Sequence, residues 1–549
     1  MKADQHDQHD QHDRRDQHDR HDRRDRSGRG PRTPAPSRTA AALACATALA
    51  LLAACGSGGD GRGSGGGPDG RKAPATSGDH STSPTPRDAP GSRPATAVTT
   101  PTATAPVPRG KGSELPDDIN GDGYPELALP LSANEEDAMP SLLAFVHGSS
   151  GGLNPATRTV LTGEDLGLPT RGDADAPTLA PATVATADLD GDGYADLVTP
   201  VSEPLGEADA DRLHTTVRTV PYVTWGRADG PRRGARATRV PLSGPDDSMD
   251  GSRPTVGDFN GDGHHDLATI RDDRVSFLVL YGPFGRDGRA ARAVPYRTPL
   301  DSDNSSGQID RLFADTIDGD RPTDLVVHAM DDNGQSASVL LTAGPDGLAR
   351  TGPTLREGNA IAFGDFDGDG LRDVAVGDTG TRNNEPGYET EAPEVDHTLT
   401  VYTRKRLEDA PLKETPTIRG IKIPDMEGAL AAADTDGDGT DELAVPLASG
   451  GVEIITVRPD SPGDIARRRT LSRTVPARVD GEKIPKQRRA ARLHGAGDFD
   501  HDGKDEIVLA WGRAPGFALS GHRPEWWWII EGTADRTAFT SEPFATDAR

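Results

Sequence analysis

Residues 364–374 read GDFDGDGLRDV, and their acidic side chains stand at positions 1, 3, 5 and 9 of a loop that starts at Asp365. Oxygen atoms at positions 1, 3 and 5 of a tight loop converge on one point, and a carboxylate at position 9 closes the cage. Gly370 at position 6 permits the turn, and position 7 can offer its backbone carbonyl. Oxygen ligands in this number suit Ca²⁺, because Mg²⁺ requires a stricter octahedron and keeps its waters. Without a cation, the crowded carboxylates would repel one another strongly.

The same pattern recurs along the chain, and we number its seven copies loop 1 to loop 7. In loops 1 to 3 the candidate Ca²⁺ ligands at positions 1, 3, 5, 7 and 9 are Asp118, Asn120, Asp122, Tyr124 and Glu126; Asp188, Asp190, Asp192, Tyr194 and Asp196; and Asp258, Asn260, Asp262, His264 and Asp266. In loops 5 to 7 they are Asp365, Asp367, Asp369, Leu371 and Asp373; Asp434, Asp436, Asp438, Thr440 and Glu442; and Asp498, Asp500, Asp502, Lys504 and Glu506.

Two loops depart from the pattern. Loop 4 begins at Thr316 and has Arg321 at position 6, so Asp318, Asp320 and Asp324 are expected to form a weak or empty site. Loop 7 has His501 at position 4, and we expect this side chain to point outward without consequence for the loop.

An EF-hand or dockerin loop shares positions 1 to 6 of this pattern, but it requires an acidic residue at position 12 and flanking helices. Position 12 is Leu, Thr or Val in the six regular copies, and position 10 is apolar every time. The residues that follow, such as DVAVG and ELAVPL, are typical of strands. The loops are therefore predicted to lie between strands.

The elements that position these loops repeat with them. A short run of small apolar residues precedes most loops, as in GALAAAD, and a further strand-like run ends near a Gly turn, as in VSFLVLYG. Three such strands and a more variable fourth make a unit of roughly sixty residues, a period that indicates a propeller or a solenoid. We expect an all-β, seven-bladed β-propeller over residues 113–549.

The combination of D-x-[DN]-G-D-G-x-x-[DE]-[LVI] with a downstream glycine-rich turn resembles the FG-GAP/VCBS-type repeat of integrin α-subunit propellers and many bacterial surface proteins. The resemblance covers roughly residues 113–549. It implies that each loop joins the first two strands of a blade and holds Ca²⁺ with the residues named above.

The N-terminal part of the chain is expected to direct export. Residues 1–54 contain a Gln-His-Asp/Arg tract and then an uncharged run that suits a signal peptide. The run ends in Leu52-Ala53-Ala54-Cys55, which resembles the lipobox of bacterial lipoproteins. This predicts a lipid on Cys55 that anchors the protein to the outer face of the cell membrane. Residues 55–112, rich in Gly, Ser, Thr and Pro, are expected to be a disordered linker.

Composition limits the function further. The net charge of −27 argues against nucleic acid as a partner, and the two cysteines both lie in the first 55 residues. The sequence contains no G-x-S-x-G, H-E-x-x-H or P-loop motif. We expect a monomeric cell-surface scaffold that binds an unknown protein or glycan; an extracellular enzyme acting on carbohydrate or lipid is the alternative.

Trp526 and Trp528 should share one side of a strand, in a blade interface or on a binding surface.

Overall fold

The computed structural model describes residues 97–549 apart from the following segments: 132–139, 170–182, 232, 244–246, 301–306, 330–336, 379–396, 405–406, 408–414, 424–429, 513–523 and 549. The described residues belong to the unit Ala46–Arg549. The expected signal peptide, the lipidation site Cys55 and the linker up to residue 96 lie outside the described residues. None of the helices that the structure describes has the length and apolar character needed to cross a membrane.

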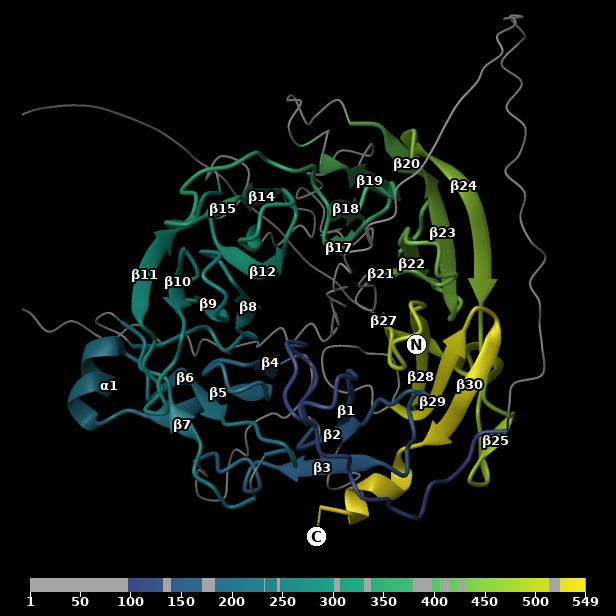
Figure 1. The fold of residues 1–549 in the computed structure, drawn as a ribbon, viewed down its shortest axis with the longest axis horizontal. Helices are drawn as coiled ribbons and strands as arrows, with labels where there is room; N and C mark the ends of the chain where they lie inside the picture. The colour runs from purple at the N-terminus through teal and green to yellow at the C-terminus, as the bar shows by residue number, and fades with distance from the viewer. Residues whose placement is uncertain are drawn as a thin grey trace, which may run out of the picture. The chain divides into compact units, whose positions relative to one another are not determined.

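Seven of the nine antiparallel sheets that the described strands form stand as blades around a ring (Figure 1). Blades 1 to 3 consist of β1 (Leu127–Leu131), β2 (Leu142–Val146) and β3 (Arg158–Thr162); β4 (Ala185–Ala187), β5 (Asp196–Pro204), β6 (Val217–Thr224) and β7 (Thr238–Arg239); and β8 (Thr255–Gly257), β9 (Asp266–Ile270), β10 (Ser276–Tyr281) and β11 (Arg292–Arg297). Blades 4 and 5 consist of β12 (Ile309–Asp315), β13 (Asp324–Ala329) and β14 (Ser338–Leu341); and β17 (Ala360–Gly364), β18 (Asp373–Gly377), β19 (Thr398–Tyr402) and β20 (Thr417–Arg419). Blades 6 and 7 consist of β21 (Ala431–Ala433), β22 (Glu442–Pro446), β23 (Val452–Arg458) and β24 (Ser461–Leu471); and β27 (Arg492–Gly497), β28 (Glu506–Gly512), β29 (Pro524–Glu531) and β30 (Ala534–Thr540).

Small elements decorate the blades. They are the helix α1 (Glu207–Leu213), the hairpins β15 (Ala343–Gly344) with β16 (Gly347–Leu348) and β25 (Arg478–Val479) with β26 (Glu482–Lys483), and the 3₁₀ turns η2 (Lys486–Arg488) and η3 (Glu542–Thr546). The fold is thus nearly all β, and the predicted seven-bladed propeller is confirmed.

Burial explains why the second strand of each blade is an apolar run. All five residues of β18 are buried, as are those of β9 and β22, because both faces of a blade pack against neighbouring blades. The innermost strands of blades 2, 3 and 6 have three residues each, and the small side chains of Ala431–Ala433 let β21 lie close to the axis. The strands predicted from sequence around the loops are therefore confirmed.

Seven clusters of buried hydrophobic side chains in the described residues lie one at each interface between adjacent blades. The three consecutive tryptophans serve two of these interfaces. Trp528 is 1% exposed and packs with Trp526 between blades 6 and 7, whereas Trp527 packs between blades 7 and 1. The blade-interface alternative for Trp526 and Trp528 is the one that the structure supports.

The ring closes without exchange of strands, since blade 7 is built from four consecutive strands and β1 contacts β29. Residues 97–113, which we call the N-terminal strap, lie along this seam. Thr99 pairs in parallel with Phe539 of β30, the N–H of Ala105 donates to the carbonyl of Ala156 at 2.7 Å, and Lys111 reaches loop 1. The expected linker extended to residue 112, yet the chain contacts the propeller from residue 98 onward, where Val98 packs against the cluster between blades 6 and 7.

The C-terminal end of the chain also lies against blade 1. The guanidinium of Arg158, in β3, donates from Nε to Asp547 Oδ2 at 2.6 Å and from Nη1 to the carbonyl of Ala103 at 3.2 Å. It also lies 4.2 Å from the ring centroid of Phe544 in η3. Because Arg158 is 7% exposed, this single side chain joins the strap, blade 1 and the C-terminal turn in a buried contact.

Candidate metal centre

The seven loops lie at the same end of their blades, because in blades 2 to 7 each loop connects the inner strand to the second strand. Loop 1 is followed directly by β1, and no inner strand precedes it in the described residues. All seven loops therefore lie around one end of the central axis. This agrees with the expectation that each loop joins the first two strands of a blade.

In the six regular loops, the carboxylate at position 1 organises the backbone. Asp365 Oδ1 accepts from the N–H groups of Gly368 at 2.7 Å and Asp369 at 3.0 Å, and Oδ2 accepts from Gly370 at 2.8 Å. Gly368 and Gly370 have φ angles of +74° and +87°, a region that L side chains rarely adopt, so glycine suits both positions. Position 5 then accepts from the N–H of position 7, as Asp369 does from Leu371 at 2.9 Å.

The carboxylate at position 9 is fixed in every one of the seven loops by the N–H of position 2. The acceptors are Glu126, Asp196, Asp266, Asp324, Asp373, Glu442 and Glu506, with distances of 2.6–3.1 Å. All seven are buried. This bond places one carboxylate of the second strand under the turn of its own loop.

Burial raises the pKa of Asp373 and of Asp196 to about 8, and the neighbouring loop carboxylates add to both shifts. Burial likewise raises the pKa of Glu506 to about 8 and that of Asp266 to about 7. These acids lie where a negative charge is unfavourable unless a positive charge joins them.

Buried oxygen atoms without a partner test whether a cation fits. Asp190, Asp367 and Asp500 all stand at position 3, and the Oδ1 atom of each is buried and has no hydrogen-bond partner. Their other oxygens can be occupied: Asp500 Oδ2 accepts from Arg536 at 2.6 Å, and Asp190 Oδ2 pairs with Arg286. The oxygen that remains is buried without a partner, and a divalent cation in the loop would provide one.

Carboxylate oxygens converge in five loops of the described chain, where three acidic residues place one ligand atom each within 4.8 Å of the others. The sets are Asp118, Asp122 and Glu126; Asp188, Asp190 and Asp196; Asp365, Asp367 and Asp373; Asp434, Asp436 and Asp438; and Asp498, Asp500 and Glu506. Carboxylates in this arrangement suit Ca²⁺.

Loops 3 and 4 are outside these five sets. Loop 3 keeps the backbone pattern around Asp258, but Asn260 at position 3 donates to Asp262 Oδ2 at 2.9 Å. Loop 4 lacks the carboxylate at position 1; Asp318 accepts from the N–H of Asp320, and burial raises the pKa of Asp324 to about 6.

Position 7, expected to supply a carbonyl, also carries a side-chain contact between loops. The side chains of Tyr194, His264, Pro322, Leu371, Thr440 and Lys504 each lie against the glycine at position 4 of the preceding loop. A Cβ built on Gly121 would be 2.7 Å from the ring of Tyr194. Tyr124 completes the circle, with its ring centroid 5.6 Å from that of His501. His501, which was expected to have no consequence for its own loop, thus contacts the first loop at the closing seam.

Position 8 was not predicted to matter, yet it links neighbouring loops. Asp441 donates its N–H to the carbonyl of Asp365 at 2.7 Å and accepts from the N–H of Asp365 at 2.8 Å. Asp505 makes the same pair of bonds with Asp434, and Thr323 makes it with Asp258. Only the repeated polar residue at position 8 in part of the copies could have indicated this.

A second residue missed from sequence is His147, whose side chain is fully buried beside loop 1. Its Nδ1 lies 3.0 Å from Glu126 Oε1, and its Nε2 lies 2.9 Å from Thr159 Oγ1. Burial lowers the pKa of His147 to about 4, so the imidazole is neutral beside the carboxyl group of Glu126. The ring therefore orients the ligand at position 9 of loop 1.

These features define a β-propeller that has acidic loops around one end of its axis, with carboxylates converging in five of them. Residues 180–208, which include loop 2, match the family model described as FG-GAP repeat. The chain is a seven-bladed β-propeller, and one segment of it is similar to the FG-GAP repeat. No match was found among curated proteins.

Proposed function

We propose that this protein is a calcium-stabilised propeller scaffold, exported and anchored to the outer face of the cell membrane by lipid on Cys55, that binds a protein or glycan. The calcium part rests on one observation above all: position-3 oxygens are buried without a partner in loops 2, 5 and 7. Calcium bound there would neutralise carboxylates whose pKa is raised by burial. The anchor rests on the sequence around Cys55, outside the described residues.

Calcium would link blades because the loops contact one another through positions 4, 7 and 8. A cation that orders loop 5, for example, also fixes the carbonyl of Asp365, which accepts from Asp441 in loop 6. The expected role of the metal is therefore to stabilise the rim, and ligand binding belongs to the surfaces around it.

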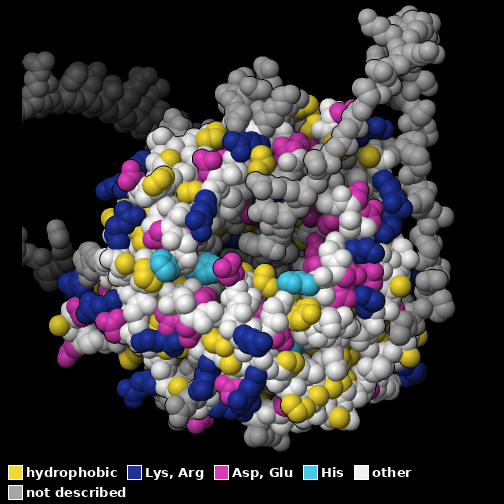
Figure 2. Space-filling view, in the orientation of Figure 1, with side chains coloured by type: hydrophobic (Ala, Val, Ile, Leu, Met, Phe, Trp, Pro, Cys, Tyr) yellow, Lys and Arg dark blue, Asp and Glu magenta, His cyan; other side chains and the backbone are white. Residues whose placement is uncertain are grey.

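The surface favours polar recognition. Among the described residues, Val275 is the large hydrophobic side chain that is exposed. Figure 2 shows acidic and basic side chains interspersed over the face in view, with hydrophobic side chains in small groups. A binding partner is therefore expected to be held by charges and hydrogen bonds rather than by an apolar patch.

Thermal unfolding of the purified chain in EDTA and in millimolar CaCl₂ tests the proposal. Calcium is expected to raise Tm by about 5 °C or more, since several kcal/mol of binding energy act on the folded state only. Equal millimolar MgCl₂ serves as the control and should raise Tm less. An unchanged Tm on calcium removal would contradict the calcium-stabilised scaffold.

Two further measurements address the remaining parts. After cell fractionation, the Cys55→Ala variant should no longer be found with the membranes. If the variant stays in the membrane fraction, lipid anchoring is contradicted. Turnover of a carbohydrate or lipid substrate by the purified chain would favour the enzyme over the scaffold.

A further inference from the structure

Two of the six regular loops, loops 1 and 3, have asparagine at position 3 followed by glycine at position 4. The pairs are Asn120-Gly121 and Asn260-Gly261; a third Asn-Gly pair, Asn333-Gly334, lies outside the described residues. Asparagine before glycine can react with the backbone, because glycine has no Cβ to hinder the approach of its own nitrogen to the side-chain carbonyl carbon of the asparagine. The two loops therefore place the same reactive dipeptide in two environments.

In loop 1 the dipeptide is protected in two ways. The N–H of Gly121 donates to Asp118 Oδ1 at 2.7 Å, and Asn120 is 0% exposed. The side-chain Nδ2 of Asn120 donates to Asp122 Oδ2 at 3.2 Å and lies 3.3 Å from His147 Nδ1. A nitrogen held by a carboxylate must break that bond before it can react, and solvent must reach a fully buried amide. Loop 1 is therefore expected to resist the reaction.

In loop 3 the dipeptide is less protected. The N–H of Gly261 donates to the carbonyl of Asp258 at 3.4 Å, whereas the equivalent N–H in loops 1, 2, 5 and 6 donates to the carboxylate at position 1 at 2.7–2.8 Å. Asn260 is half-buried, and its Nδ2 donates to Asp262 Oδ2 at 2.9 Å. In both loops the position-7 side chain of the next loop packs against the glycine, so this contact does not distinguish them.

We propose that Asn260 is a site of spontaneous deamidation, which converts loop 3 into a loop with aspartate at positions 1, 3, 5 and 9. The backbone nitrogen of Gly261 loses its proton to solvent and forms a bond to Cγ of Asn260. The side-chain nitrogen takes up a proton and leaves as ammonia, so that a five-membered succinimide ring remains. Water then opens the ring and leaves aspartate or its isomer isoaspartate at this position. One water is consumed and one ammonia is released, and no oxidant or reductant takes part.

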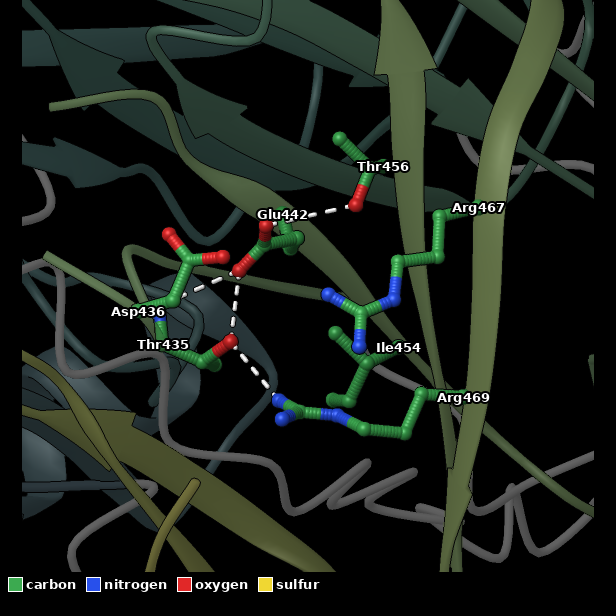
Figure 3. A pocket seen from close by; sticks show the side chains of 7 residues that line it. All are labelled: Thr435, Asp436, Glu442, Ile454, Thr456, Arg467 and Arg469. Atoms are coloured by element: carbon green, nitrogen blue, oxygen red, sulfur yellow. Dashed lines mark hydrogen bonds between the residues drawn. The ribbon is translucent and has the colours of Figure 1, made fainter. Parts of the chain in front are cut away.

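Aspartate at position 3 would give loop 3 the same acidic positions as loops 2 and 5, in which carboxylates converge. Figure 3 shows an aspartate at this position in loop 6, where Asp436 and the position-9 acid Glu442 line one small cavity. The change replaces a neutral amide by a charged ligand, and calcium affinity depends on the number of charged ligands. This gain of calcium binding rests on the proposed function, whereas the deamidation itself does not.

Peptide mapping by mass spectrometry tests the deamidation, after incubation of the full-length chain in mildly alkaline buffer below its Tm. Replacement of the amide NH₂ by OH increases the mass of the peptide that contains Asn260. We expect this product to form at Asn260 at least about tenfold faster than at Asn120, the scale of the hydrogen bond that holds the N–H of Gly121. Equal rates at the two asparagines, or no change at Asn260, would overturn the proposal.

Asn260→Gln provides the matched control, because it keeps the amide but its longer side chain cannot form the five-membered ring. Its peptide should keep its mass under the same conditions. A mass increase that persists in the Asn260→Gln peptide would place the reaction at another residue, and the proposal would be wrong.

Asn260→Asp tests the consequence separately. Calcium should raise the Tm of this variant by about 1–3 °C more than it raises the Tm of the unmodified chain, since an added carboxylate strengthens binding to the folded state. An equal increase in both would mean that the deamidated loop gains no calcium site. If calcium leaves the Tm of both chains unchanged, the proposed function fails, whatever the mass of the Asn260 peptide.

Discussion

Glycine at position 4 of a loop is constrained both by its backbone conformation and by the side chain packed against it. In loop 1 the two constraints can be distinguished by comparing Gly121 at position 4 with Gly123 at position 6. Gly121 and Gly123 have φ angles of +67° and +92°, so both disfavour a side chain on conformational grounds. Only at Gly121 would a Cβ also meet a neighbour, the ring of Tyr194 at 2.7 Å; at Gly123 nothing lies within 4 Å.

We therefore expect Gly121→Ala to lower the free energy of unfolding by about 1–3 kcal/mol more than Gly123→Ala does, because it adds overlap between blades 1 and 2 to the same backbone strain. Urea unfolding of the two variants in CaCl₂ measures the difference. Equal destabilisation would mean that the packing of position 7 on position 4 contributes nothing to the rim.

At the scale of single residues, the sequence predicts which side chains are candidate metal ligands better than it predicts which residues contact one another. Regular spacing identified the carboxylates, and five sets of them do converge. The roles of Asp441, His147 and His501 could not be predicted from spacing, because their partners lie in another loop or strand. The smallest of these sequence separations is the 21 residues between Glu126 and His147. Such contacts depend on how blades meet in three dimensions.

At the scale of elements, the N-terminal strap is held by backbone hydrogen bonds. The N–H of Thr99 donates to the carbonyl of Ala538 at 3.0 Å, and the carbonyl of Thr99 accepts from Thr540 at 2.9 Å. Its side-chain Oγ1 donates to the same carbonyl of Ala538 at 3.1 Å.

Thr99→Pro should loosen the strap, because proline lacks the N–H, whereas Thr99→Ala keeps it. We expect Thr99→Pro to lower the free energy of unfolding by about 1–3 kcal/mol and to speed amide exchange at Thr540, with Thr99→Ala changing stability by less than about 1 kcal/mol. If the two variants exchange at Thr540 at the same rate, the strap does not hold the seam.

The strap also shows where prediction of elements stops. Strands such as β18 and β22 are predictable because five apolar or small residues in a row must be buried. Residues 97–112 have no such run and are rich in Thr, Ala and Pro, so their composition resembles a linker. Backbone pairing to an exposed strand edge leaves no hydrophobic pattern in the sequence.

For the molecule as a whole, the raised pKa values predict how stability changes with pH when calcium is absent. Asp196, Asp373 and Glu506 have pKa values of about 8 in the fold, against ordinary values of 3.8 for Asp and 4.5 for Glu. The folded state therefore binds more protons than the unfolded state between about pH 4 and pH 8, and its stability in EDTA falls as the pH rises through this window.

Calcium should counter this loss, because it stabilises the ionised carboxylates. The increase in Tm caused by calcium is expected to be several degrees larger at about pH 8 than at about pH 5. Calorimetric scans in EDTA and in CaCl₂ at both pH values measure it. An increase that is the same at both would show that these carboxylates do not bind the cation.

Parallel pairing of Thr99 with Phe539 of the last strand has a mechanical consequence. Tension applied to the chain ahead of residue 97 reaches the propeller first at β30, next to the seam where the last blade meets the first. The bonds at Thr99 and Ala105 then bear the load before any blade does, and Arg158 shares it with the C-terminal turn. Stretching the protein from its N-terminal end should therefore peel the strap as a separate low-force event, before the ring itself opens.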